Sequence, residues 1–198
     1  MSESTSVHGG GGRAGGFRPG ERLVDLANAV RDEPEASRDE PEASRDVLAA
    51  VLARHGETER DLARLTAREA TALRGAVAEL TDLVLTETDT DRAATALNSL
   101  LERCGARPRL SRHDGHTWHL HVDRDDEANW AEWLTASGAL ALARMLSEQG
   151  GIAWGECAAS GCRRLFLGGG PGAPRRYCSR TCATRTRVAA HRRRHAQP

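Results

Sequence analysis

The 198-residue chain is long enough for one medium domain and a small module, and its formal net charge is zero. That average conceals an asymmetry. Residues 1–156, here called the body, hold 18 arginines against 28 acidic residues, whereas residues 157–198 hold ten arginines and no Asp or Glu. The negative balance excludes the body as a general binder of polyanions. No apolar stretch is long enough to span a bilayer and the N-terminus lacks a signal pattern, so we expect a cytoplasmic protein.

The N-terminal part predicts a tail, a helix and a loop. Residues 1–20 are mostly small and polar and are expected to form a disordered tail. An apolar stripe with helical spacing follows at Leu23, Leu26, Ala27 and Val30. Residues 32–38, Asp-Glu-Pro-Glu-Ala-Ser-Arg, are then repeated without change at 39–45. Because the proline of each copy interrupts a helix, we predict an acidic loop over 32–45.

The next part of the chain predicts further helices with a core of Leu, Val and Ala. The first of these helices ends at His55 and Gly56, and residues 58–65 are expected to form a short helix. Thr66 and Glu69 then make a capping box, which predicts the start of a long helix. Gly105 ends the last of this series, and Cys104 beside it is expected to be a small buried residue without a reactive role.

Residues 108–123 change period and predict a β-hairpin. Trp118, Leu120 and Val122 alternate with polar residues, as in a half-buried strand that pairs with residues 107–112 through a turn at 113–115. No acid or cysteine completes a defined ligand set here, so solvated histidines are favoured over a metal site at His113, His116, His119 and His121. A long helix over 126–149 follows and completes a mainly helical α+β domain over residues 21–150.

Two cysteine pairs make up the strongest motif of the chain. Cys157 and Cys162 have four residues between them, Cys178 and Cys182 have three, and fifteen residues separate the pairs. This spacing is typical of four thiolates around one Zn²⁺ ion, and such a closed shell is structural because it leaves no position for a catalytic water. Two disulfides are the alternative interpretation. The linker over 152–154 is short, so the module is expected to pack on the body.

The elements around the cysteines predict a treble-clef-like zinc finger over residues 151–198. Residues 164–167 and 175–177 are expected to pair as a hairpin, and a basic helix over 180–195, capped by Ser179 or Thr181, follows it. The metal is expected to supply most of the folding free energy of so small a module. His191 and His195 lie four apart on this helix and are interpreted as polar helix-end residues, because the four cysteines already complete the shell.

The arginines of the finger are candidate contacts to a polyanion. Arg163, Arg164, Arg176 and Arg180 are expected to offset the negative charge of a zinc ion with four thiolates. Neutralising phosphates would release counterions, and the candidate nucleic-acid contacts are Arg175, Arg176, Arg180, Arg185, Arg187, Arg192, Arg193 and Arg194. A merely solvated basic face is the alternative. The chain has no recognisable catalytic set, so we expect that it is not an enzyme.

The finger resembles the CGNR zinc finger, which is found in bacterial proteins described as stress-induced transcription regulators. Where that family has Cys-Gly-Asn-Arg, this chain has Cys182, Ala183, Thr184 and Arg185. The body resembles the ABATE domain that precedes such fingers, at residues 22–28 and 96–101. The resemblance implies an α+β sensor-like domain fused to a DNA-binding finger.

Three functional hypotheses follow. The first is a DNA-binding transcription regulator with one structural Zn²⁺, a regulatory N-terminal domain and a DNA-contacting basic helix, acting as a homodimer because one short helix makes few base contacts. The second is a zinc-stabilised protein-interaction or RNA-binding module without sequence-specific DNA binding. The third, an enzyme such as a nuclease, lacks an evident second metal set.

Overall fold

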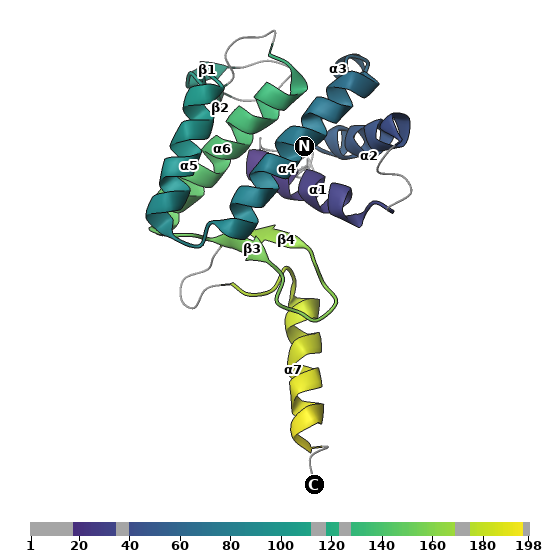
Figure 1. Ribbon diagram of the computed structural model, residues 1–198, viewed down its shortest axis with the longest axis vertical. Coiled ribbons are helices and arrows are strands. Elements are labelled where there is room, and N and C mark those ends of the chain that lie inside the picture. Colours follow the sequence, from purple (N-terminus) through teal and green to yellow (C-terminus); the bar gives the residue numbers. More distant parts are fainter. Residues whose placement is uncertain (1–17, 35–39, 112–117, 123–127, 169–174, 196–198) are drawn as a thin grey trace, which may run out of the picture.

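The computed structural model describes residues 18–34, 40–111, 118–122, 128–168 and 175–195. Figure 1 shows a helical body made of α1 to α6, with β3 and β4 at one end and α7 pointing away from it. The elements in chain order are α1 (Pro19–Asp32), α2 (Pro41–Arg54), α3 (Glu59–Leu62), α4 (Ala67–Thr86), α5 (Thr90–Arg103), β1 (Arg109–Ser111), β2 (His119–His121), α6 (Trp130–Gln149), β3 (Trp154–Glu156), β4 (Leu165–Leu167) and α7 (Arg180–His195).

The core of the body lies between the helices and consists of Leu, Val and Ala, as predicted. Helix α6 packs on α4, α5 and α1, and α2 packs on α1 and α4. Burying each large apolar side chain contributes about 1.5–3 kcal/mol. The fully buried ones are Leu26, Leu48, Val51, Leu52, Leu65, Leu73, Val77, Leu80, Leu97, Leu134 and Leu142.

Helices α4 and α6 approach closely because α6 has a glycine where they meet. A Cβ atom added to Gly138 would lie 2.8 Å from Cδ1 of Leu80, which is closer than packed carbon atoms come. The absence of a side chain at Gly138 therefore allows the leucine side chain of α4 to lie directly on the α6 backbone.

Polar side chains begin most of these helices. Thr58, Thr66 and Asn129 each accept a hydrogen bond from the backbone N–H three residues later. At Thr58 the reciprocal bond of a capping box is also present. At Thr66, the carboxylate of Glu69 instead accepts from the N–H of Trp130 at 3.4 Å, so it connects the start of α4 to the start of α6.

The prediction of a loop over 32–45 is wrong for the second copy of the repeat. Helix α2 begins at Pro41, because proline lacks only an N–H that is unpaired anyway in the first turn and its φ suits a helix. Arg74 connects the two copies: it donates to Ser44 at 2.9 Å and pairs with the carboxylate of Glu33. Residues 35–39 lie outside the described residues, as do residues 1–17; α1 begins two residues inside the expected tail.

The predicted hairpin of the body is confirmed, although one of its residues is not where we expected. Strands β1 and β2 are antiparallel, with Leu110 opposite Leu120. Val122 is buried beside Cys104, which is therefore a small core residue. Trp118 was expected on the buried face but is 64% exposed, because β2 begins only at the next residue and no pleat directs Trp118 to the core. The predicted turn lies outside the described part of the chain, and so does His116. The same holds for the side chains of His119 and His121.

Candidate metal centre

The first cysteine pair lies in the loop of a hairpin. Strand β3 pairs with β4, with Glu156 opposite Leu165, and the N–H of Cys157 donates to the carbonyl of Arg164 at 2.9 Å. The prediction that β4 pairs with residues 175–177 is therefore wrong: β4 has its partner on the other side of the first pair. Residues 175–177 contact the loop around the first cysteine pair instead: the N–H of Ala158 donates to the carbonyl of Arg176 at 2.9 Å.

The second cysteine pair lies at the start of α7. Cys178 precedes the helix and Cys182 is in its first turn. The hydroxyl of Ser179 accepts from the N–H of Cys182 at 3.2 Å, which confirms Ser179 as the cap. The arrangement is treble-clef-like, as predicted, with the second pair at a helix start, but the hairpin encloses the first pair instead of lying between the two pairs.

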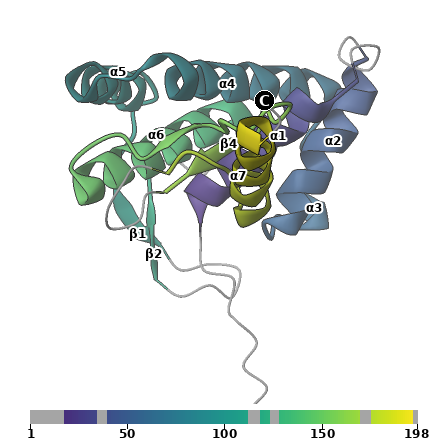
Figure 2. The same cartoon turned by 90° about the horizontal axis from the view of Figure 1, so that it is seen from below.

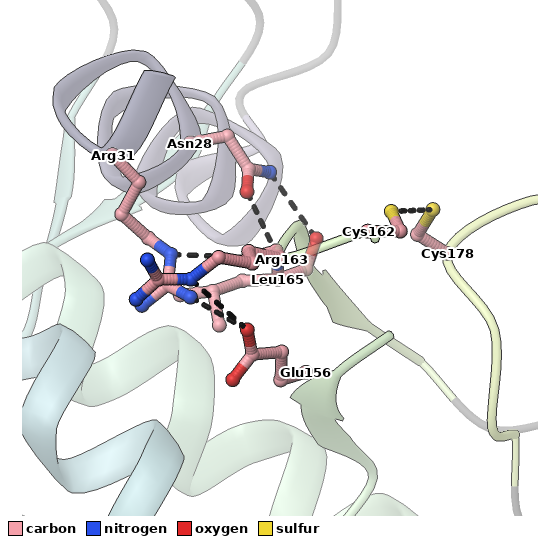
Figure 3. A network of polar contacts seen from close by, with 7 residues as sticks. All are labelled: Asn28, Arg31, Glu156, Cys162, Arg163, Leu165 and Cys178. Atoms are coloured by element: carbon pink, nitrogen blue, oxygen red, sulfur yellow. Dashed lines mark hydrogen bonds and ion pairs between the residues drawn. The ribbon is translucent and has the colours of Figure 1, made fainter. Parts of the chain in front are cut away.

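All four thiol groups converge on one point. The sulfur atoms of Cys157, Cys162, Cys178 and Cys182 lie within 4.8 Å of one another. The Sγ atoms of Cys162 and Cys178 are 3.8 Å apart (Figure 3), and those of Cys178 and Cys182 are 3.6 Å apart. Zn–S bonds of about 2.3 Å in a tetrahedron require S···S distances of about 3.8 Å. The four thiols are free rather than disulfide-bonded, and together they can hold one zinc ion.

The thiols differ in acidity before a metal binds. Burial opposes ionisation of Cys157, but the N–H groups of Cys178 and Ala159 donate to its sulfur, so that its pKa falls to about 7. Burial and the adjacent thiols raise the pKa of Cys178 to about 12. Zinc binding must therefore displace a proton from Cys178, and the charge of the ion supplies the driving force.

Two arginines hold the finger together. Arg175 donates to the carbonyls of Leu167 at 3.1 Å, Tyr177 at 2.8 Å and Cys178. Arg185 donates to the carbonyl of Ser160 at 3.3 Å and lies 3.9 Å from the sulfur of Cys182. Both guanidinium groups were predicted only as polyanion contacts, because sequence does not show which carbonyls lie within reach.

The finger packs on the body through α1, as the short linker predicted. Figure 3 shows the side-chain amide of Asn28 against the backbone of Leu165, and Arg31 against Glu156 and Arg163. Arg31 donates to Glu156 at 2.8 Å and to the carbonyl of Arg163 at 3.1 Å. Trp154 and Leu165 are buried in the main core, so that the finger and the body share one apolar cluster.

Two of the arginines expected to offset the charge of the zinc site are paired elsewhere. Arg164 donates to Asp32 of α1 at 2.9 Å, and Arg163 lies 4.0 Å from Glu156. Both residues thus have carboxylate partners that the sequence did not indicate. Arg185 is instead the guanidinium that reaches a ligand sulfur.

The remaining arginines of α7 face solvent. Arg180 and Arg187 are exposed, as are Arg192, Arg193 and Arg194, and within the described residues no hydrogen bond or ion pair engages these five. The rings of His191 and His195 contact each other, with centroids 4.3 Å apart. Among the residues that the structure describes, the four cysteines form the only group of three or more suitable metal ligands.

Comparison with known families accounts for nearly the whole described chain. Residues 154–195 match the CGNR zinc finger, and residues 20–149 match the ABATE family, whose description is "Putative stress-induced transcription regulator". The chain belongs to the ABATE family. Its ABATE region spans the six helices of the body and the β1–β2 hairpin, and its zinc finger begins at β3. In this ABATE protein the arginine that ends the four-residue finger motif is Arg185, the residue that reaches Ser160 and Cys182.

Two further findings bear on this ABATE protein. A search of curated proteins found no match. Within the described residues, none of the helices has the length and apolar character needed to cross a membrane.

Proposed function

We propose that this ABATE protein is a DNA-binding transcription regulator in which α7 contacts DNA. The observation that carries the proposal is the set of exposed arginines on a helix that points away from the body (Figure 1). Arg180, Arg187 and Arg194 recur every seven residues and therefore lie on one face of the helix. A row of guanidinium groups on a helix of 16 residues suits the phosphates that border a DNA groove.

Electrostatics favour contact through the zinc finger rather than through the body. Residues 1–156 carry 28 acidic residues against 18 arginines, so the body repels a polyanion. Figure 2 views the molecule along α7 and places the C-terminal end of that helix in front of the body, where a duplex can approach it. A zinc ion held by Cys182 and the other three cysteines would fix the first turn of α7 and thereby the direction in which the helix projects.

The proposal gives the zinc ion a structural role and the protein no enzymatic one. Four cysteines complete a tetrahedral shell, so no coordination position is left for a reacting water. Arg175, Arg176 and Arg185 stay as proposed secondary contacts, since Arg175 and Arg185 also hold carbonyls of the finger. Because one helix reaches few base pairs, we propose that a homodimer binds the target in the cytoplasm and that the ABATE region regulates this binding.

The experiment is a salt series on binding to a labelled DNA duplex of arbitrary sequence. The observed affinity of the wild type is expected to fall steeply between about 50 and 200 mM salt, since phosphate contacts release counterions. Replacing Arg192, Arg193 and Arg194 together by Gln should flatten the slope of log affinity against log salt by about 0.9 for each phosphate that the variant no longer neutralises.

A matched control separates a local contact from a change in net charge. Arg54, Arg60 and Arg68 are exposed on the body, and their replacement by Gln removes the same charge. This control should keep the wild-type slope. Equal slopes for the two triple variants, or binding that does not depend on salt, would contradict the proposal, and zinc loading without any DNA binding would favour a protein partner.

A further inference from the structure

A cavity of about 720 Å³ lies on the opposite side of α6 from α4 and α5. It is formed by the start of α1, the second half of α6, the β1–β2 hairpin and the end of β4. Figure 2 shows the hairpin on this side of α6 and the helices α4 and α5 on the other. Small-molecule sites usually have volumes of about 300–1,000 Å³, so the cavity has the size of a ligand site.

One wall of the cavity is apolar although it faces solvent, whereas charged and polar side chains line the rest. Three large hydrophobic residues are exposed in the described part of the chain, and two of them, Leu110 at 69% and Trp118 at 64%, line this cavity. Leu120, Leu140 and Met145 continue the same wall. Exposed apolar side chains that gather around a hollow indicate a binding surface, because scattered ones have no common neighbour.

The rim of the cavity carries charges that already neutralise each other. Arg18 pairs with Glu21 at 2.6 Å, and Arg144 pairs with Glu148 at 3.3 Å. Because each pair is neutral, the rim offers an ionic ligand little net electrostatic attraction. The rim therefore favours a ligand without net charge.

The floor of the cavity is closed by tight packing. A Cβ atom added to Gly20 would lie 3.0 Å from Cδ1 of Leu167 and 3.7 Å from the Cβ of Ala141, so α1, α6 and β4 meet there without a gap. Leu167 belongs to the strand that follows the first cysteine pair. A molecule in the cavity would thus contact both the ABATE region and the zinc finger.

We propose that this cavity binds an uncharged, largely apolar small molecule with an aromatic ring that packs on Trp118. The size of the cavity, its two exposed apolar side chains and its neutralised rim all support this class of ligand. The inference is independent of DNA binding, because none of the arginines of α7 lines the cavity.

Two fluorescent probes with one scaffold test this ligand class. N-phenylnaphthylamine is uncharged and apolar, and anilinonaphthalene sulfonate is the same ring system with a sulfonate group. Titrated into the full zinc-loaded chain, the neutral probe is expected to saturate one site per chain with a large increase in emission. The sulfonate should bind at least about tenfold more weakly, because the apolar wall would partly desolvate its charge and the neutral rim gives little net attraction in return.

Two matched variants locate the bound probe. Leu110→Asp places a carboxylate on the apolar wall of the cavity and should weaken binding of the neutral probe at least about tenfold. Val188→Asp makes the same kind of change at the third exposed hydrophobic residue, which is 43% exposed on α7, and should leave binding unchanged. Both sites are exposed, so circular dichroism should find both variants folded.

The outcomes decide the proposal in either direction. Saturable binding of the neutral probe that Leu110→Asp weakens and Val188→Asp does not would establish the site. Failure of the neutral probe to saturate, equal binding by wild type and Leu110→Asp, or tighter binding of the sulfonate would each overturn it. None of these results depends on whether the chain binds DNA.

Discussion

The side-chain amide of Asn28 pairs with both backbone polar groups of Leu165, which lies 137 residues later in the chain. The amide oxygen accepts from the N–H of Leu165 at 2.7 Å, and the amide nitrogen donates to its carbonyl at 3.2 Å. Both residues are buried, at 3% exposure each. The Asn28 side chain thus supplies β4 with the same two hydrogen bonds that a neighbouring strand would make. These bonds hold the zinc finger against the body.

Replacing Asn28 by Ala should destabilise the whole chain. Two buried backbone groups lose their partner, and a buried unsatisfied polar group costs about 1–3 kcal/mol. Chemical denaturation of the zinc-loaded protein measures the loss in free energy of unfolding. Asn98→Ala, at an exposed position of α5, is the control and should change stability by less than about 0.5 kcal/mol. Equal effects of the two changes would contradict the role of the Asn28 pair.

A second pair of variants tests the packing of α6 on α4. Gly138→Ala should cost about 1–3 kcal/mol of stability, because its Cβ atom would clash with Leu80 at 2.8 Å. Gly75→Ala makes the same change on α4, where a Cβ atom meets nothing within 4 Å, and should gain up to about 1 kcal/mol from helix propensity. Thermal unfolding of both variants gives the sign, and opposite signs are the expected result.

Zinc content should depend on Cys178 and not on Cys104. Elemental analysis of the purified wild type is expected to find one zinc ion per chain, and Cys178→Ala should lose it because three thiolates no longer close the shell. Cys104→Ala removes a thiol that is buried beside Val122 and Ala136, away from the cluster, and should keep the metal. Full zinc content in Cys178→Ala would show that the four sulfurs are not the ligand set.

The loss of Arg175 should accelerate zinc release. Its guanidinium donates to three carbonyls, those of Leu167, Tyr177 and Cys178, and Arg175→Gln cannot span all of them. Release to a chromogenic chelator should therefore be faster in this variant than in the wild type. Arg176→Gln changes the neighbouring exposed residue, whose side chain lies over the ring of Tyr177 at 5.9 Å, and should release zinc at the wild-type rate.

The zinc site was predictable because its information is local. Each cysteine pair spans a few residues, and Ser179 is adjacent to the helix that it caps. The partner of β4 was not predictable from local pattern: residues 175–177 look as extended as Trp154–Glu156, and only the closed loop around Cys157 decides between them. The mainly helical body and its leucine core followed from periodicity, which the structure confirms.

The sequence did not reveal roles that depend on a residue's place in the fold. Asn28 lies in a run that resembles the ABATE domain, but its partner is 137 residues away. Arg175 has the sequence context of a phosphate contact, and its three carbonyl partners become visible only in the folded finger. A proline inside an acidic repeat predicts an interrupted helix, whereas Pro41 stands in the first turn and begins α2.

The contact between α1 and β4 also has a consequence for synthesis on the ribosome. At about 5–20 residues per second, the 137 residues between Asn28 and Leu165 take on the order of ten seconds to make. During that interval the side-chain amide of Asn28 in α1 lacks its partner in β4, and the core lacks Trp154 and Leu165. The body is therefore completed only after β4 has been made, and until then the nascent chain leaves part of its core exposed.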